Sequence, residues 1–248
     1  MMEQTLGRVL VVVPTYNERE NLPLIAGRLR TALPDAHLLI ADDNSPDGTS
    51  EVADELAAAD DHIHVLHRPE KQGLGAAYID AFHWGMAQGF DVLVEMDADG
   101  SHQPEELHKL LAALADGADL VIGSRWVPGG KVLNWPSHRE LLSRGANVYV
   151  RLMLGLPVRD ATAGFRAYRA AALEKIGLAD VESQGYCFQV DLTLRTARHG
   201  LRVVEVPITF VERTHGTSKM SGKVMYEAFW RVGVWGVTGL PARLRRHR

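Results

Sequence analysis

Alternation of strands and helices in the first half of the chain is the feature that most restricts its fold. Four short apolar runs have the length and branching of buried strands. They lie at Arg8–Val13, His37–Ala41, Ile63–Leu66 and Val92–Val94. Segments with the apolar spacing of helices separate them. This pattern is typical of a mostly parallel sheet with right-handed crossovers, so we predict an α/β fold with a central sheet flanked by helices.

Polar loops follow three of these predicted strands. Pro14-Thr15-Tyr16-Asn17-Glu18 follows the first, Asp42-Asp43-Asn44 the second, and Asp97-Ala98-Asp99 the Val92 run. Open α/β sheets bind their ligands at the carboxyl ends of their strands. We therefore expect the three loops to converge on one edge of the sheet and to form the functional site there.

Asp97 and Asp99 are candidate metal ligands. With alternating side chains, we expect both carboxylates to point the same way, with the small Ala98 between them. Paired carboxylates suit Mg²⁺ or Mn²⁺, which complete their shell with water and substrate phosphate. A solvated turn ahead of a helix beginning near Pro104 has the same residue types, so the pair alone leaves both interpretations open.

Composition and missing motifs exclude several classes of function. The net charge of −4 argues against nucleic acid as a partner. With Cys187 as its only cysteine, the chain forms no internal disulfide and no Cys-rich metal site, which agrees with a reducing compartment. A dinucleotide-binding GxGxxG after the first strand and a GxxxxGK[ST] loop are both absent. No apolar run reaches the length of roughly 18 residues expected of a membrane-spanning helix.

The second half of the sequence is organised differently. A strand at Leu120–Ile122 leads into Gly123-Ser124-Arg125, and the Gly-, Pro- and Trp-rich segment Trp126–Pro136 is predicted to be a long mobile loop. Arg139–Leu154 has helical periodicity, which places Arg139 and Ser143 on one face. Pro207 interrupts the predicted strand Leu201–Phe210, so that strand is expected at a sheet edge.

The C-terminal segment Val224–Leu240 is aromatic-rich and amphipathic, and a basic tail follows it. Such a helix is typical of segments that lie in a membrane interface. A helix packed on the body of the protein, with a solvated tail, has the same pattern. The sequence leaves these two interpretations open.

Taken together, the motifs resemble the inverting nucleotide-sugar glycosyltransferases of family 2 with the GT-A fold, and most of all the polyprenol-phosphate (dolichol-phosphate) mannose synthases. The resemblance rests on PTYNERENL at 14–22, ADDNSPDGT at 41–49, EMDADGSHQPEEL at 95–107, GSR at 123–125, NWPSHRELLSRGAN at 134–147, DATAGFRAY at 160–168 and EVPITFVERTHGTSK at 205–219. It implies a GT-A (Rossmann-like) domain over residues 1–220 and a C-terminal amphipathic helix with a basic tail over 221–248. It also implies transfer of mannose from GDP-mannose to a polyprenyl monophosphate, with inversion and with Mg²⁺ or Mn²⁺.

The resemblance also implies which residues bind the donor. Those that would contact the nucleotide sugar are Pro14, Tyr16, Glu18, Ile40, Asp42, Asp97, Ala98, Asp99, Arg213 and Lys219, with looser matches for sugar hydroxyls at Gln189 and Asp191. Asp42 would hydrogen-bond the base, and Asp97 and Asp99 would hold the metal. Close relatives can supply a Gln as a further ligand where this chain has Ser101, so Ser101 is the third candidate ligand and water could replace it.

For the acceptor, the resemblance implies that Arg125, Arg139 and Ser143 grip the lipid phosphate, with Asp99 and Arg125 as the catalytic residues. Guanidinium groups match phosphate oxygens in bidentate fashion. Many relatives carry C-terminal membrane spans, and this chain stops before any. We therefore expect a cytoplasmic, peripheral enzyme at the cytoplasmic face of the membrane, docked on the membrane surface or on a separate membrane-anchoring protein.

Three alternatives stay open at this point. The same fold could use UDP-glucose and make glucosyl-phosphopolyprenol. It could transfer sugar to a protein or polysaccharide, although the cationic acceptor set favours a phosphate. It could also be a non-catalytic protein that binds nucleotide sugars, which the intact Asp-x-Asp argues against.

Overall fold

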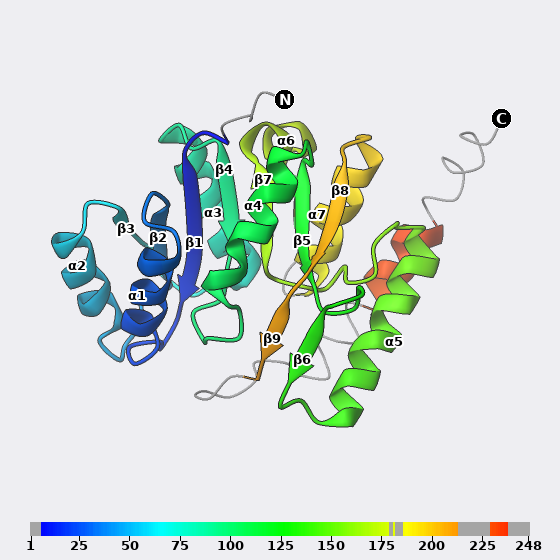
Figure 1. Ribbon diagram of the computed structural model, residues 1–248, viewed down its shortest axis with the longest axis horizontal. Coiled ribbons are helices and arrows are strands. Elements are labelled where there is room, and N and C mark those ends of the chain that lie inside the picture. Colours follow the sequence, from blue (N-terminus) through cyan, green and yellow to red (C-terminus); the bar gives the residue numbers. More distant parts are fainter. Residues whose placement is uncertain (1–5, 179–180, 182–185, 213–228, 238–248) are drawn as a thin grey trace.

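A seven-stranded sheet forms the centre of the protein (Figure 1). The computed structural model describes residues 6–178, 181, 186–212 and 229–237. The strand order is β3-β2-β1-β4-β7-β5-β8. The strands of this sheet are β1 (Val9–Thr15), β2 (His37–Asp42), β3 (Ile63–His67), β4 (Val92–Glu95), β5 (Leu120–Ser124), β7 (Arg166–Arg169) and β8 (Val203–Pro207).

Strand β7 is the exception in an otherwise parallel sheet. It lies between β4 and β5 and runs antiparallel to both, whereas every other neighbouring pair is parallel. The predicted mostly parallel sheet is therefore confirmed. Strand β8 lies at the sheet edge, as its proline predicted.

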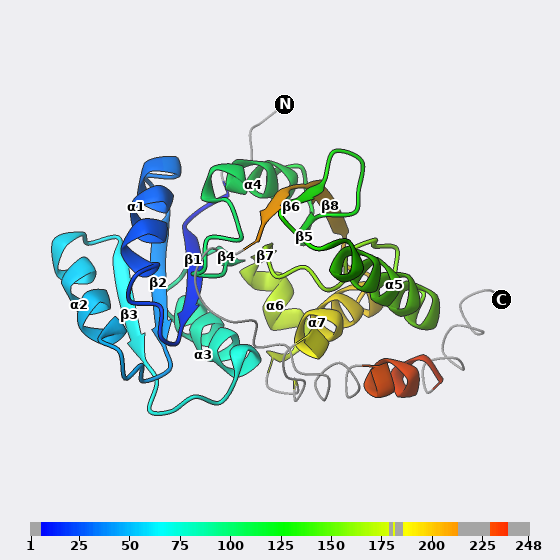
Figure 2. The same ribbon diagram turned by 90° about the horizontal axis from the view of Figure 1, so that it is seen from below.

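Helices cover both faces of the sheet (Figure 2). One face carries α1, α2 and α4, and the other carries α3, α6 and α7. The two cores follow from strand alternation, because Val11 and Val13 face the first group of helices while Leu10 and Val12 face the second. The helices on the sheet are α1 (Leu22–Ala32), α2 (Thr49–Ala59), α3 (Leu74–Ala87), α4 (Leu107–Ala115), α6 (Ala170–Ile176) and α7 (Tyr186–Arg198).

The carboxyl ends of β1, β2, β4 and β5 open onto the same edge of the sheet, the lower one in Figure 1. Thr15 and Asp42 are register partners at the ends of β1 and β2, and the Asp43 N–H donates to the Thr15 carbonyl at 3.0 Å. The predicted convergence of the polar loops is thereby confirmed.

The segment Trp126–Pro136 is not a loop throughout, in contrast to the prediction. It contains β6 (Lys131–Leu133), which pairs in parallel with β9 (Thr209–Val211) to form a second, two-stranded sheet. The prediction failed because the partner strand lies far away in the sequence. Pro207 ends β8, and the chain then continues as β9 toward the same edge as the polar loops.

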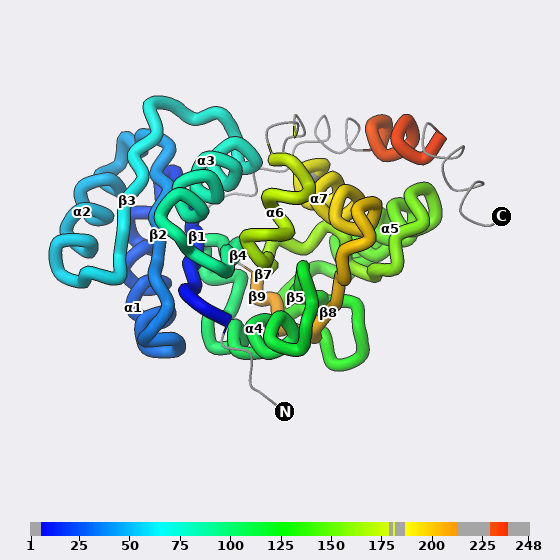
Figure 3. Tube along the Cα trace, turned by 90° about the horizontal axis from the view of Figure 1, so that it is seen from above, coloured from blue at the N-terminus to red at the C-terminus, as the bar shows by residue number. Residues whose placement is uncertain are grey.

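A pair of helices stands beside the central sheet. Helix α5 (Ser137–Leu154) contacts the helical residues 229–237, and Figure 3 shows both next to α7. The Tyr149 ring stacks on Phe229 at 4.2 Å, and its hydroxyl donates to the Phe229 carbonyl. The C-terminal helix thus packs on the body of the protein. Among the residues that the structure describes, no helix has the length and hydropathy needed to cross a membrane.

Three histidines gather where β2 and β3 begin. His37 Nδ1 lies 3.0 Å from His64 Nε2, and the His37 ring contacts those of His62 and Phe90. Burial, with His62, His64, Arg8 and Arg30 nearby, lowers the pKa of His37 to about 4. The His37 ring is therefore neutral at physiological pH.

Candidate active site

Hydrogen bonds from backbone N–H groups to side-chain acceptors hold the Asp97–Ser101 loop. The sequence predicted that strand alternation continues through Asp97 and Asp99. Strand β4 ends at Glu95, so the alternation does not reach them. Instead, the Asp97 N–H donates to His102 Nδ1, and the Ser101 N–H donates to Asp99 Oδ1, both at 3.0 Å. A 3-10 turn at Pro104–Glu106 then leads into α4, where the sequence predicted the first helical turn.

This loop fits a divalent metal that takes oxygen ligands. The Asp97 side chain is 35% exposed, and Asp99 is half-buried. Among the described residues, the buried Ser101 hydroxyl has no hydrogen-bond partner, which is the state expected of an oxygen that awaits a ligand. No cluster of three or more His, Cys, Asp or Glu able to hold a metal occurs in the described part of the chain. Two carboxylates and a hydroxyl are a donor set that suits a metal which also takes water and substrate phosphate.

Asp42 organises the loop after β2. Its side chain is fully buried, and its two oxygens accept bonds from the Thr15 hydroxyl, the Ser45 N–H and hydroxyl, and the Ser50 hydroxyl. Burial alone would raise the pKa of Asp42, but these hydrogen bonds lower it below its ordinary value. The carboxylate is thus ionised and held in place by the loop. Its predicted bond to a nucleotide base stays a prediction.

The other nucleotide-binding candidates lie on β1, on β2 and in the loop after β1. Pro14 is on β1, and the Lys71 ammonium lies 3.7 Å from the centre of the Tyr16 ring. The Glu18 N–H donates to Thr49 at 3.0 Å, which ties this loop to the start of α2. Ile40 is completely buried in the core on the sheet face that carries α1, α2 and α4. The structure brings Pro14, Tyr16 and Glu18 to one edge with Asp42, whereas the Ile40 side chain belongs to the interior.

A buried ion pair fixes Arg125. Arg125 Nε and Nη2 donate to the two carboxylate oxygens of Asp160 at 2.8 and 2.7 Å, and its backbone N–H donates to Asp160 Oδ2 at 2.9 Å. Arg125 is 7% exposed and Asp160 is fully buried. Thr162 and Asn147 complete the cluster. The sequence motif at 160–168 identified this segment, but it gave no signal that Asp160 holds Arg125.

Aromatic rings surround the cations of this region. The Arg125 guanidinium lies 5.3 to 5.5 Å from the ring centres of Trp126, Trp135 and Phe210. The indole N–H groups of Trp126 and Trp135 are buried and have no hydrogen-bond partner among the described residues. The two indole N–H groups beside the Arg125 guanidinium could donate to an anion, while Asp160 already balances the Arg125 charge.

Arg139 and Ser143 lie on α5, four residues apart on the same helix. Arg139 forms an ion pair with Glu212 at 2.6 Å and covers the Trp135 ring at 4.3 Å. The structure therefore brings Arg139 and Arg125 to the same aromatic group. Sequence reasoning missed Glu212, because only the end of β9 places it beside α5.

A second buried polar group lies behind the Asp97–Ser101 loop. Gln189 Nε2 donates to Glu95 Oε2 at 2.6 Å, and the Arg166 guanidinium donates to the backbone carbonyl of Gln189. Burial raises the pKa of Glu95 to about 7, although the nearby Arg166 acts in the opposite direction. Gln189, a predicted sugar contact, is thus buried against β4. Its side-chain carbonyl has no partner among the described residues.

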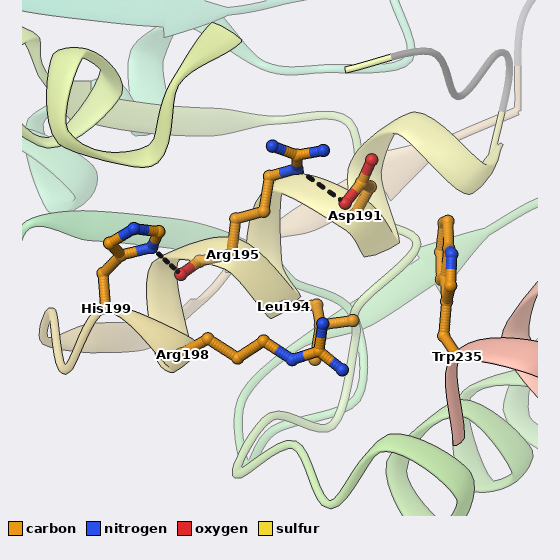
Figure 4. Close-up of a pocket in the computed structure, with 6 residues that line it drawn as sticks. All are labelled: Asp191, Leu194, Arg195, Arg198, His199 and Trp235. Atoms are coloured by element: carbon orange, nitrogen blue, oxygen red, sulfur yellow. Dashed lines mark hydrogen bonds and ion pairs between the residues drawn. The ribbon is translucent and has the colours of Figure 1, made fainter. Parts of the chain in front are cut away.

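Asp191 lies elsewhere. It forms an ion pair with Arg195 at 2.9 Å and lines a pocket of about 340 Å³ between α7 and residues 229–237. Figure 4 shows Arg195, Arg198 and His199 on one side of this pocket and Trp235 on the other. The residues that line this pocket include neither Asp97 nor Asp99. The remaining predicted donor residues, Arg213 and Lys219, lie outside the described residues.

Comparison with solved structures identifies the fold class. Glucosyl-3-phosphoglycerate synthase of Mycobacterium tuberculosis, in complex with phosphoglyceric acid, matches with a TM-score of 0.66 and 20% identity over 94% of this chain and 79% of that one. The same enzyme with Mn²⁺, UDP-glucose and phosphoglyceric acid matches with a TM-score of 0.66 and 21% identity, over 92% of this chain and 80% of that one. These likenesses confirm the predicted GT-A-like α/β fold.

Comparison by sequence gives nearer relatives. The chain is 60% identical to the polyprenol monophosphomannose synthase of Mycolicibacterium smegmatis, over 96% of this chain and 90% of that protein. It is 59% identical to the undecaprenyl-phosphate mannosyltransferase of Micrococcus luteus, over 96% and 99%. The dolichol-phosphate mannosyltransferase of Pyrococcus furiosus is 40% identical, over 89% of this chain and 61% of its own. The profile described as Glycosyl transferase family 2 matches residues 10–177, and the chain belongs to this family.

Proposed function

We propose that this protein transfers mannose from GDP-mannose to a polyprenyl monophosphate, with inversion at the anomeric carbon and with bound Mg²⁺ or Mn²⁺. The observation that carries the proposal is that the loop pairing with Arg125 lies beside the Asp97 side chain. A Cβ at Gly164, on the Asp160 loop that holds Arg125, would lie 3.9 Å from Asp97 Oδ2. Carboxylates for a metal diphosphate and a guanidinium for an anionic acceptor therefore share one site. The mannosyltransferase names of the relatives at 59 and 60% identity support the same reaction.

Asp97, Asp99 and Ser101 would hold the metal. When bound, the metal supplies positive charge to the diphosphate leaving group and so lowers the barrier to its departure. The chain's own contribution is to fix the carboxylates before the donor arrives, through the backbone bonds of the loop. Pro14, Tyr16, Glu18, Asp42 and Ala98 would bind the nucleotide, and Arg213 and Lys219 would contact its phosphates.

Arg125, Arg139 and Ser143 would position the acceptor phosphate. A phosphate monoester is already anionic at neutral pH, so its oxygen attacks without a strong general base. The difficulty is to bring two anions together in line, and the two arginines offset that repulsion. Asp160 holds Arg125 in a fixed orientation, so the guanidinium loses little conformational freedom when it binds a phosphate.

Membrane docking through two helices is part of this proposal. Leu141, Val148 and Leu152 form an exposed stripe on α5, and Trp230 and Val237 are exposed on the neighbouring helix. Residues 141–154 and 229–237 contain arginines but no Asp or Glu. An apolar face flanked by arginines suits the interface of an anionic membrane. This face would hold the enzyme where its lipid acceptor resides.

Vesicle flotation tests the docking surface. Leu152→Glu should reduce recovery with vesicles of phosphatidylglycerol and phosphatidylcholine, because it places a carboxylate in the apolar stripe. Leu24→Glu is the matched control, since Leu24 is similarly exposed, at 66% against 70%, but lies on α1 across the sheet. Equal flotation of the two variants would refute this surface.

A transfer assay tests the reaction. Labelled GDP-mannose and UDP-glucose are offered in parallel with a short polyprenyl phosphate, with Mg²⁺, with Mn²⁺ and with EDTA. UDP-glucose is included because the fold relative from M. tuberculosis was solved with it and with Mn²⁺. We expect label in lipid from GDP-mannose alone, and its loss with EDTA.

Asp99→Ala should abolish transfer while the fold survives, and Glu55→Ala on the exposed face of α2 is the control. Full activity of Asp99→Ala would overturn the metal assignment. Transfer from UDP-glucose alone would replace the donor. Absence of label from both donors would overturn the proposed function.

A further inference from the structure

His102 occupies the junction between the two halves of the proposed site. Its side chain is 2% exposed. The Asp97 backbone N–H donates to its Nδ1 at 3.0 Å, so Nδ1 is the acceptor and the ring proton resides on Nε2. One bond of this histidine thus fixes the first residue of the metal-binding loop.

The loop depends on this bond for its closure. Gly100 adopts the left-handed φ of 76°, and the Gln103 side chain donates to the Gly100 carbonyl at 3.0 Å. Together with the bond from the Ser101 N–H to Asp99, these contacts form a tight turn. His102 joins the end of the turn back to its start. Without the acceptor at Nδ1, the Asp97 N–H would be left without this partner.

The rest of the His102 ring contacts residues near Arg125, where we propose that the acceptor phosphate binds; these residues are called the acceptor side below. It stacks on Phe165 with ring centres 5.0 Å apart and planes 12° apart, and it meets the edge of Phe210 at 5.6 Å. A Cβ at Gly164 would lie 3.5 Å from the His102 ring. Phe210 is on β9, and the next residue, Val211, donates its N–H to the Ser101 carbonyl at 3.1 Å. The ring therefore lies between the metal-binding loop and the elements around Arg125.

We propose that His102 is a positioning residue, which holds Asp97 through Nδ1 and couples the metal-binding loop to the acceptor side through its ring. This inference rests on the proposed function. Groups that orient metal ligands from behind typically change metal affinity or activity by about 10- to 100-fold when they are removed. Loss of the hydrogen-bond acceptor at Nδ1 should therefore weaken metal binding, while the ring contacts keep the fold together.

Three substitutions separate the two parts of this role. His102→Asn places Oδ1 close to the position of Nδ1, so it keeps an acceptor for the Asp97 N–H. His102→Phe keeps a ring against Phe165 but has no acceptor. His102→Gln carries its carbonyl one bond further from the backbone. The matched control is His108→Phe on α4, because the His108 Nδ1 also contacts a backbone group but the ring is exposed.

The readouts are Mn²⁺ affinity in the presence of GDP, hydrogen exchange of the peptide that contains the Asp97 amide, and kcat and KM for transfer. We expect His102→Phe and His102→Gln to weaken Mn²⁺ binding by about 10- to 100-fold and to speed exchange at Asp97. His102→Asn should stay within about threefold of the wild type in Mn²⁺ affinity and in exchange at Asp97, because it keeps the hydrogen bond. Its loss of the ring should appear instead as a higher KM for the polyprenyl phosphate. His108→Phe should change none of these quantities.

Unchanged Mn²⁺ affinity and exchange in His102→Phe would overturn the inference alone, provided that the wild type transfers mannose. Equal losses in His102→Asn and His102→Phe, with both variants folded by circular dichroism, would also overturn it, because they would show that the acceptor at Nδ1 is not what matters. A wild type that neither transfers mannose nor binds Mn²⁺ with GDP would overturn the proposed function and the inference together.

Discussion

Asp160→Asn is the substitution with the largest effect that we expect on stability. It removes the charge that compensates Arg125 but keeps the shape of the side chain and one carbonyl oxygen. The pair is bidentate, and neither partner is more than 7% exposed. Breaking a buried ion pair by neutralising one partner costs about 3–5 kcal/mol, because the remaining charge stays buried without compensation. The Asn amide also turns a donor toward a guanidinium that has only donors.

The measurement is urea unfolding followed by circular dichroism, with thermal unfolding alongside. For a chain of this size each kcal/mol shifts Tm by about 2–4 °C, so we expect a fall of about 6–20 °C. Glu140→Gln is the control, since its pair with Arg144 joins α5 residues with side chains 36 and 51% exposed. Exposed pairs of this spacing contribute about 0.3–0.5 kcal/mol. Asp160→Asn and Glu140→Gln losing the same small amount of stability would refute the reasoning.

Three further predictions concern packing and pH. Gly85→Ala should destabilise the fold by about 1–3 kcal/mol in urea unfolding, because its Cβ would lie 2.5 Å from a methyl group of buried Leu93. Gly145→Ala on α5, where nothing lies within 4 Å, should instead stabilise it by about 0.5–1 kcal/mol, and a loss of stability there would contradict this. The lowered pKa of His37 means that protonation favours the unfolded chain, so stability is complete above about pH 6.5 and falls as the pH approaches 4. His37→Phe should show a smaller drop in Tm between pH 7 and 4.5, and equal drops would exclude this role. Gly236→Leu should displace the last described helix from α5 and weaken vesicle flotation, since a Cβ there would lie 2.9 Å from the Met153 carbonyl; unchanged flotation would argue against the packing.

Local sequence patterns determined the scaffold of this protein. The apolar runs at 9–13 and 92–94 became central strands, because a run of branched apolar residues is stable only when both faces of the strand are covered. The polar loops after those strands had to meet at one edge once the strands were parallel. The positions of Asp97 and Asp99 could therefore be predicted from short-range spacing alone.

Only the tertiary structure decided how the charged residues are held. Asp160 meets Arg125 because β7 inserts antiparallel between β4 and β5, a placement that the residues of β7 do not encode locally. Glu212 meets Arg139 because β9 pairs with β6. Strand pairing and ion pairing of this kind join residues 35 and 73 positions apart, and periodicity within one segment carries no information about such partners. The sequence by itself thus determined which residues reach the edge of the sheet, while long-range packing decided their partners and orientation.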